Sequence, residues 1–148
     1  MSISSTINDQ IKQAMLAKDK DRLAALRDIK AKILLEATSG SGTEVSDDVA
    51  IKICQKLFKQ RMETYELYVA QNRSDLANEE LLQAKVIEEF LPQQLTEDEI
   101  KKEIADAIAS LGVSGPQDMG KLMGYLTSKL AGKADGKVIS ALVRAALN

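Results

Sequence analysis

The residues best suited to chemistry are the lysines and glycines of residues 118–137, which read DMGKLMGYLTSKLAGKADGK. A lysine ammonium group binds anions such as phosphates, and a glycine lets another backbone approach closely because it has no side chain. The segment therefore predicts a surface that contacts phosphate groups. The candidate binding residues are Gly120, Lys121, Gly124, Lys129, Gly132, Lys133, Gly136 and Lys137.

Gly120 and Gly124 are expected in the interior of a helix, one turn apart and on one face. Each costs a helix about 1 kcal/mol relative to alanine, so a reason for both is expected. Two explanations stay open: another helix packs closely there, or a sugar-phosphate backbone approaches the cleared groove.

The charge of the chain is unevenly distributed. The formal net charge is −2, yet residues 112–148 hold five basic and two acidic residues, while residues 96–111 hold two basic and five acidic ones. Lys133 and Lys137 flank the expected start of the last helix, where free amides also favour an anion. This polarity favours a nucleic-acid ligand, with a solvated lysine face as the alternative.

Several classes of catalytic and metal site are excluded by composition. Histidine is absent and cysteine occurs once, so no Ser-His-Asp or Cys-His relay and no Cys/His zinc site is expected. The stretch from Gly115 to Lys121 resembles a phosphate-binding loop, but Leu122 stands where Ser or Thr must hold magnesium. We expect no catalytic residue, cofactor or metal, although carboxylate, lysine and tyrosine chemistry stays open.

The elements that must position this segment are helices, because apolar residues recur at helical spacing and no stretch alternates with period two. The first helix is expected to begin near Thr6, and the second to end in a loop at residues 38–42. Ser46 or Asp47 should cap a long third helix. A fourth should run from near residues 72–74 to Leu91, before Pro92.

The second half carries clearer boundary signals. Thr96 and Glu99 have the spacing of a capping box that starts the fifth helix, and Gly112 is a favourable C-terminal cap. Pro116 is expected at the first position of a sixth helix that runs to Gly132. Asp135 should cap the last helix.

These elements predict an all-α fold: an N-terminal helical bundle joined by a short hinge to a small C-terminal three-helix domain. The boundaries are 1–91 for the bundle, 92–95 for the hinge and 96–148 for the three-helix domain. No run of 18 apolar residues occurs, and the polar N-terminus lacks the layout of a signal peptide. We expect a cytoplasmic protein without membrane contact.

Five segments of the sequence resemble the GatB/YqeY family. The residues MGKLMG at 119–124 and KLAGKADG at 129–136 are similar to its signature. The residues LPQQLTEDEI at 91–100 look like its hinge and second-domain start, and 18–23 with 26–31 resemble the free-standing YqeY members.

The resemblance implies a larger N-terminal helical domain and a small C-terminal three-helix domain. It also implies kinship with the tail of the GatB subunit of aspartyl/glutamyl-tRNA amidotransferase, which grips tRNA while amide transfer occurs in a separate domain. We therefore expect tRNA or another structured RNA to bind residues 115–148.

Two alternatives stay open. In the first, the chain is a protein-interaction adaptor of a tRNA aminoacylation or transamidation complex, held through its N-terminal bundle. In the second, it shares the glutamine-dependent carbon–nitrogen ligase activity of its larger relative. That second alternative rests on the family label alone, because no part of this sequence resembles the catalytic domain of that relative.

Overall fold

The computed structural model describes residues 2–40 and 44–148, and within these ranges it contains helices and no strands. The all-α prediction is confirmed. The chain divides into two compact units, Met1–Leu91 and Pro92–Asn148. Each unit has its own apolar core and is described by itself. The hinge between them stays a prediction.

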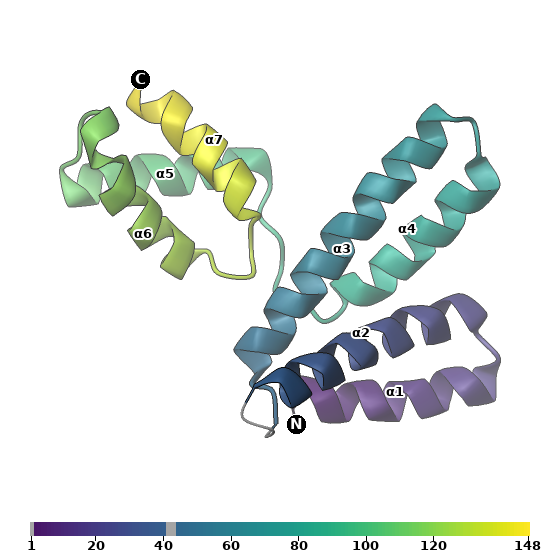
Figure 1. The fold of residues 1–148 in the computed structure, drawn as a ribbon. Coiled ribbons are helices and arrows are strands. Elements are labelled where there is room, and N and C mark those ends of the chain that lie inside the picture. The colour runs from purple at the N-terminus through teal and green to yellow at the C-terminus, as the bar shows by residue number, and fades with distance from the viewer. Residues whose placement is uncertain (1, 41–43) are drawn as a thin grey trace. The chain divides into compact units, whose positions relative to one another are not determined.

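The first unit consists of two helical hairpins (Figure 1). Helices α1 (Ile3–Ala17) and α2 (Lys20–Ser39) form one, and α3 (Asp47–Ala70) and α4 (Ser74–Glu88) form the other. Helix α2 packs against both α3 and α4, so the hairpins share one core. The largest fully buried side chains in this core are Ile7, Leu26, Ile29, Cys54 and Ile87.

Two arginines connect the helices of this unit. The Arg61 guanidinium of α3 lies 2.7 Å from the Asp28 carboxylate of α2, and its Nε donates to Gln83 of α4 at 3.1 Å. Arg22 of α2 pairs with Glu89, directly after α4, at 2.7 Å. Polar contacts therefore link the helices of this unit in addition to the apolar core.

The start of the first helix differs from the prediction. Helix α1 begins at Ile3, because the Ser2 side chain accepts the amide of Ser5 and caps the helix. The Thr6 hydroxyl instead donates to the Ser2 carbonyl at 3.0 Å. Ser46 is the cap of α3. Residues 41–43 of the loop after α2 lie outside the described residues.

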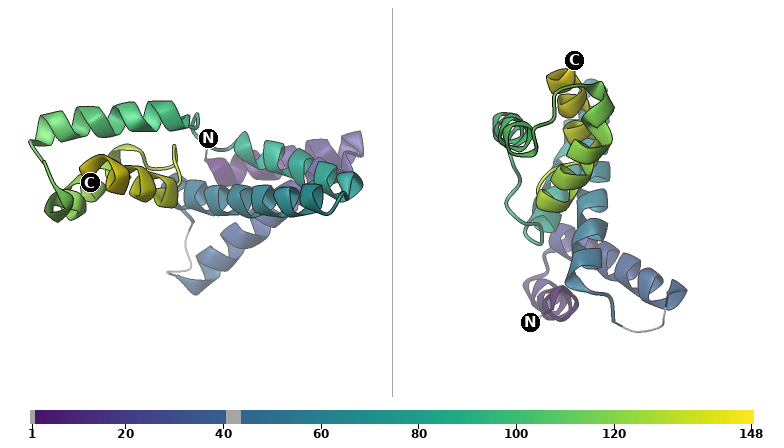
Figure 2. Two further views of the ribbon diagram at one scale, coloured as in Figure 1. Left: turned by 90° about the horizontal axis from the view of Figure 1, so that it is seen from above. Right: turned by 90° about the vertical axis from the view of Figure 1, so that its left-hand side faces the viewer.

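The second unit contains α5 (Glu97–Leu111), α6 (Met119–Lys129) and α7 (Gly136–Leu147). Helices α6 and α7 run in opposite directions and α5 packs against both, as the views in Figure 2 also show. Their apolar faces enclose Ile104, Leu122, Leu126, Ile139 and Val143. The predicted three helices are present.

The local boundary signals of this unit hold in most positions. Thr96 and Glu99 form the predicted capping box, and Gly112 ends α5 in the left-handed conformation with φ +67°. Pro116 opens a short 3₁₀ turn, Pro116–Asp118, and α6 begins only at Met119. The Asp118 carboxylate accepts the amide of Ser114, which closes this turn before the helix.

Within residues 2–40 and 44–148, no helix is both long and apolar enough to cross a bilayer.

Candidate nucleic-acid interface

The two glycines of α6 leave its outer face open. The sequence predicts an interior position for both glycines. Because α6 begins at Met119, Gly120 lies in the first helical turn instead, whereas Gly124 is interior. A Cβ atom at either position would have no neighbour within 4 Å among the described residues outside the helix's own backbone. Packing within the described chain therefore does not explain either glycine.

The lysines of α6 lie on different sides of the helix. At about 100° per residue, Lys121 lies about 80° around the axis from the midpoint between Gly120 and Gly124, and Lys129 about 160°. Lys129 is turned toward α5, where its Nζ lies 2.9 Å from a Glu103 carboxylate oxygen. The predicted groove is therefore not edged by Lys129 in this arrangement.

Lys129 is held by two groups of its own unit. Besides the Glu103 ion pair, its Nζ lies 5.8 Å from the centroid of the Tyr125 ring. The Glu103 carboxylate, above all, raises the pKa of Lys129. This ammonium group is therefore charged at neutral pH, but an internal anion already neutralises it.

The loop between α6 and α7 is anchored at its backbone. Gly132 has φ +77°, a left-handed conformation that favours glycine, and its carbonyl accepts the Gln94 side-chain amide at 2.7 Å. The Leu95 amide donates to the Lys133 carbonyl at 2.9 Å. The backbone of Lys133 is thus fixed, while its side chain is exposed.

The start of α7 carries the last two candidates. Gly136 is the first helical residue, and the predicted cap Asp135 accepts the amide of Lys137 at 3.1 Å. The side chain of Lys137 is exposed. An anion at this helix start would therefore compete with the Asp135 carboxylate for that amide.

The structure brings the lysines of residues 129–137 to one end of the α6–α7 hairpin and leaves Lys121 apart. Lys121 and Lys129 are eight positions apart, which is about 12 Å along the helix axis. Within this unit, the ion pairs of the described residues are Lys101–Glu97 and Lys129–Glu103. Lys121, Lys133 and Lys137 take no part in either of them.

Sequence reasoning missed Glu103 and Gln94. The tally of acidic residues placed Glu103 in a negative segment, but nothing in the local sequence indicates that it reaches α6. Gln94 fell within the predicted hinge at 92–95, and its bond to Gly132 attaches this part of the segment to the second unit. Both contacts join residues far apart in the chain.

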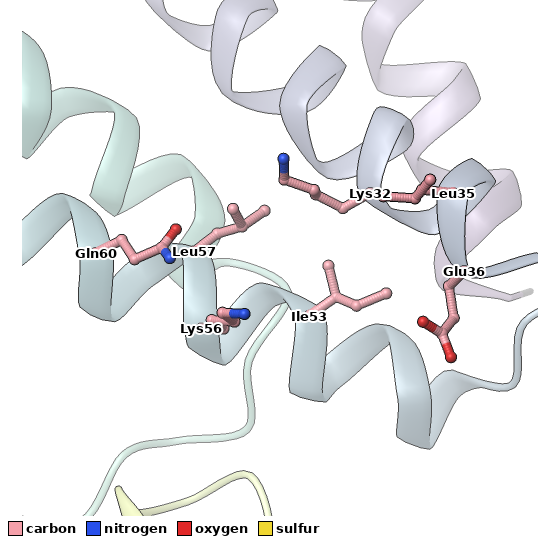
Figure 3. A pocket seen from close by; sticks show the side chains of 7 residues that line it. All are labelled: Lys32, Leu35, Glu36, Ile53, Lys56, Leu57 and Gln60. Carbon is pink, nitrogen blue, oxygen red and sulfur yellow. The ribbon is translucent and has the colours of Figure 1, made fainter. Parts of the chain in front are cut away.

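A second candidate surface lies in the first unit, where a hollow of about 300 Å³ separates α2 from α3 (Figure 3). The side chain of Leu35, 64% exposed, and those of Ile53 and Leu57 give the hollow its apolar part. Lys32 of α2 and Lys56 of α3 contribute a positive charge from each wall, and Glu36 of α2 contributes a negative charge. The hollow is suited to an apolar side chain with an acidic group beside the two lysines.

Two curated relatives are similar to part of the chain. Both are called "Altered inheritance of mitochondria protein 41, mitochondrial". The one from Lachancea thermotolerans is 26% identical over 114 residues, which is 76% of this chain and 61% of that protein. The one from Vanderwaltozyma polyspora is 31% identical over 85 residues, which is 57% of this chain and 46% of that protein.

The chain thus spans about half of each of these two relatives, whose names place them in mitochondria. A cytoplasmic location of this chain stays a prediction. The profile of one protein family, described as Yqey-like protein, matches residues 4–147 and so includes both units. The chain belongs to the YqeY-like protein family.

Proposed function

We propose that this YqeY-like chain is a non-catalytic binding module for structured RNA, with tRNA as the expected ligand, and that its second unit makes the contact. The proposal combines family membership with the resemblance of residues 119–136 to the tRNA-gripping tail of GatB. The whole matched region, residues 4–147, is consistent with this kinship.

One observation carries the proposal: open backbone and exposed lysines occur together in this unit. The outer face of α6 is open at both glycines. Lys121 lies on α6 beside them, Lys133 lies in the loop before α7, and Lys137 lies in the first turn of α7. A Cβ atom at Gly120 or Gly124 would have no neighbour within 4 Å among the described residues outside the helix's own backbone. Lys121, Lys133 and Lys137 are exposed. Open backbone with unpaired ammonium groups suits a sugar-phosphate chain.

The chemistry favours recognition of shape over recognition of base sequence. A-form RNA is gripped through phosphates and 2′-hydroxyls, mostly without base contacts. The exposed aromatic group of this unit is Tyr125, at 39% exposure, and Lys129 lies over its ring. The unit therefore offers little surface for stacking bases.

The test is a gel-shift titration of the full chain with unfractionated tRNA over a series of salt concentrations. Three phosphate contacts predict a log–log slope of about −2 to −3. Lys133→Glu combined with Lys137→Glu should weaken binding at least tenfold. A matched control, Lys101→Glu with Lys102→Glu on α5, makes the same charge change and should weaken it much less. Absence of binding at low salt contradicts the proposal.

A second candidate function is that of a protein-interaction adaptor, which the hollow between α2 and α3 favours. Its lysines on opposite walls and its exposed Leu35 suit a segment with an apolar anchor and acidic groups placed beside the lysines, away from Glu36. Pull-down from nuclease-treated lysate should retain a protein with the wild-type chain and lose it with Leu35→Glu. Leu67→Glu changes a similarly exposed leucine that does not line the hollow, and should retain it.

A further inference from the structure

Glu103 is the acidic residue that forms an ion pair with a lysine of residues 118–137. It lies in α5, yet its carboxylate reaches Lys129 of α6 with an oxygen–nitrogen distance of 2.9 Å. The side chains of Glu103 and Lys129 remain 30% and 46% exposed. The Glu103 oxygen that makes the contact is itself buried, whereas the Lys129 side chain is open to a competing phosphate.

The ammonium group of Lys129 has a second neighbour in the same place. Its Nζ lies 5.8 Å from the centroid of the Tyr125 ring, which is near enough for a cation–π contact. Glu103 and Tyr125 thus hold Lys129 against its own unit. A phosphate that recruits Lys129 must draw it away from both groups.

We infer that Glu103 acts as an intramolecular competitor of the RNA phosphates for Lys129 and lowers the RNA affinity of the second unit. The inference rests on the proposed function and assigns to the same surface a residue that sets its strength. Lys121, Lys133 and Lys137 have no acid paired with them in the unit, so Glu103 divides the lysines into three available groups and one that is restrained.

Competition by Glu103 changes the salt dependence of RNA binding. A lysine that neutralises a phosphate releases counterions from the RNA, and each such contact steepens the slope by about 0.7 to 0.9. Lys129 adds less than a full contact while Glu103 neutralises it. Removal of the Glu103 charge should therefore add one contact to the slope.

The experiment compares tRNA binding by the wild-type chain, Glu103→Gln, Lys129→Gln and the double variant. Glu97→Gln is the matched control, because it makes the same charge change on α5 but removes the partner of Lys101 instead. Unfractionated tRNA is titrated over a salt series, and circular dichroism verifies the helical content of each variant.

Glu103→Gln should bind about two- to fivefold tighter, the range expected for the loss of an exposed ion pair, with a slope steeper by about 0.7 to 0.9. Lys129→Gln alone should change the affinity less than about twofold. In the double variant the gain of Glu103→Gln should disappear, because the released group is absent. Glu97→Gln should reproduce neither change.

The failures are distinguishable. If the wild-type chain binds tRNA but Glu103→Gln binds equally or more weakly, or if its gain survives in the double variant, the inference is overturned while the RNA-binding function stands. If neither the wild-type chain nor Glu103→Gln binds tRNA at low salt, the proposed function falls and the inference falls with it.

Discussion

The side-chain amide of Gln94 donates to the carbonyl of Gly132 at 2.7 Å and to the carbonyl of Pro92 at 2.8 Å. Both amide hydrogens of this glutamine are thereby used. One of these bonds crosses 38 residues of sequence and attaches the segment before α5 to the loop that carries Lys133. Gln94 is thus a structural tie in the second unit, although its sequence context is that of a linker.

The first prediction concerns this tie. Gln94→Ala removes two hydrogen bonds that orient the loop, and should lower the stability of the second unit by about 1 to 2 kcal/mol. Thermal or urea unfolding followed by circular dichroism measures the change. Gln93→Ala alters the exposed neighbouring glutamine and should leave stability within about 0.5 kcal/mol. Equal effects of the two substitutions would contradict this role.

The second prediction is a pH dependence at the start of α5. The Glu99 carboxylate accepts the amide of Thr96 at 3.0 Å, and this backbone bond is the main reason why its pKa is lowered. A lowered pKa in the folded chain means that the carboxylate stabilises the fold above the ordinary value of 4.5, and that this contribution disappears as the pH falls below it.

Glu99→Gln retains a hydrogen-bond acceptor but cannot titrate. The variant should therefore show a shallower loss of stability between neutral pH and pH 3 than the wild-type chain. Urea unfolding midpoints measured over this pH range test the expectation. Asp98→Asn supplies a matched control in the same helical turn, and an identical flattening with that variant would count against the capping role of Glu99.

Local signals in the sequence were sufficient for most helix boundaries. Ser46, Thr96, Gly112 and Asp135 cap their helices as predicted. A cap depends on hydrogen bonds between residues two to four positions apart, so the local sequence determines it. The prediction that the first helix begins near Thr6 was wrong because Ser2 supplies an equivalent hydroxyl one turn earlier, and the helix extends to that cap.

The candidate site was less predictable, since its arrangement depends on contacts between helices. The residues of the glycine–lysine segment were identifiable by type and spacing alone. That Lys129 turns toward α5 depends on the position of Glu103, which the helix packing determines. The interior position expected for Gly120 was wrong because the 3₁₀ turn at Pro116–Asp118 delays the start of α6.

The third prediction concerns Arg61, whose side chain is 16% exposed and joins three helices of the first unit. Arg61→Met keeps much of the apolar stem but removes the contacts to Asp28 and Gln83. Because two partly buried polar groups lose their partner, the first unit should lose about 1 to 3 kcal/mol of stability.

Arg73 supplies the matched comparison for that substitution. It pairs with Asp75 at 3.3 Å, and both side chains are more than half exposed. An ion pair this exposed to solvent contributes little to stability, so Arg73→Met should change the urea midpoint little. A larger loss for Arg73→Met than for Arg61→Met would show that burial of the ion pair does not determine its contribution.

The fourth prediction concerns the thiol of Cys54, which is fully buried in the core of the first unit. Burial raises its pKa to about 11, so almost no reactive thiolate exists at neutral pH. The native chain should therefore react with an aromatic disulfide reagent at least a hundredfold more slowly than the chain in urea. A native rate close to the unfolded rate at pH 8 would contradict a closed core at this position.

Cys54→Ala should cost less stability than Cys54→Asn, which buries an amide without a partner among these apolar side chains.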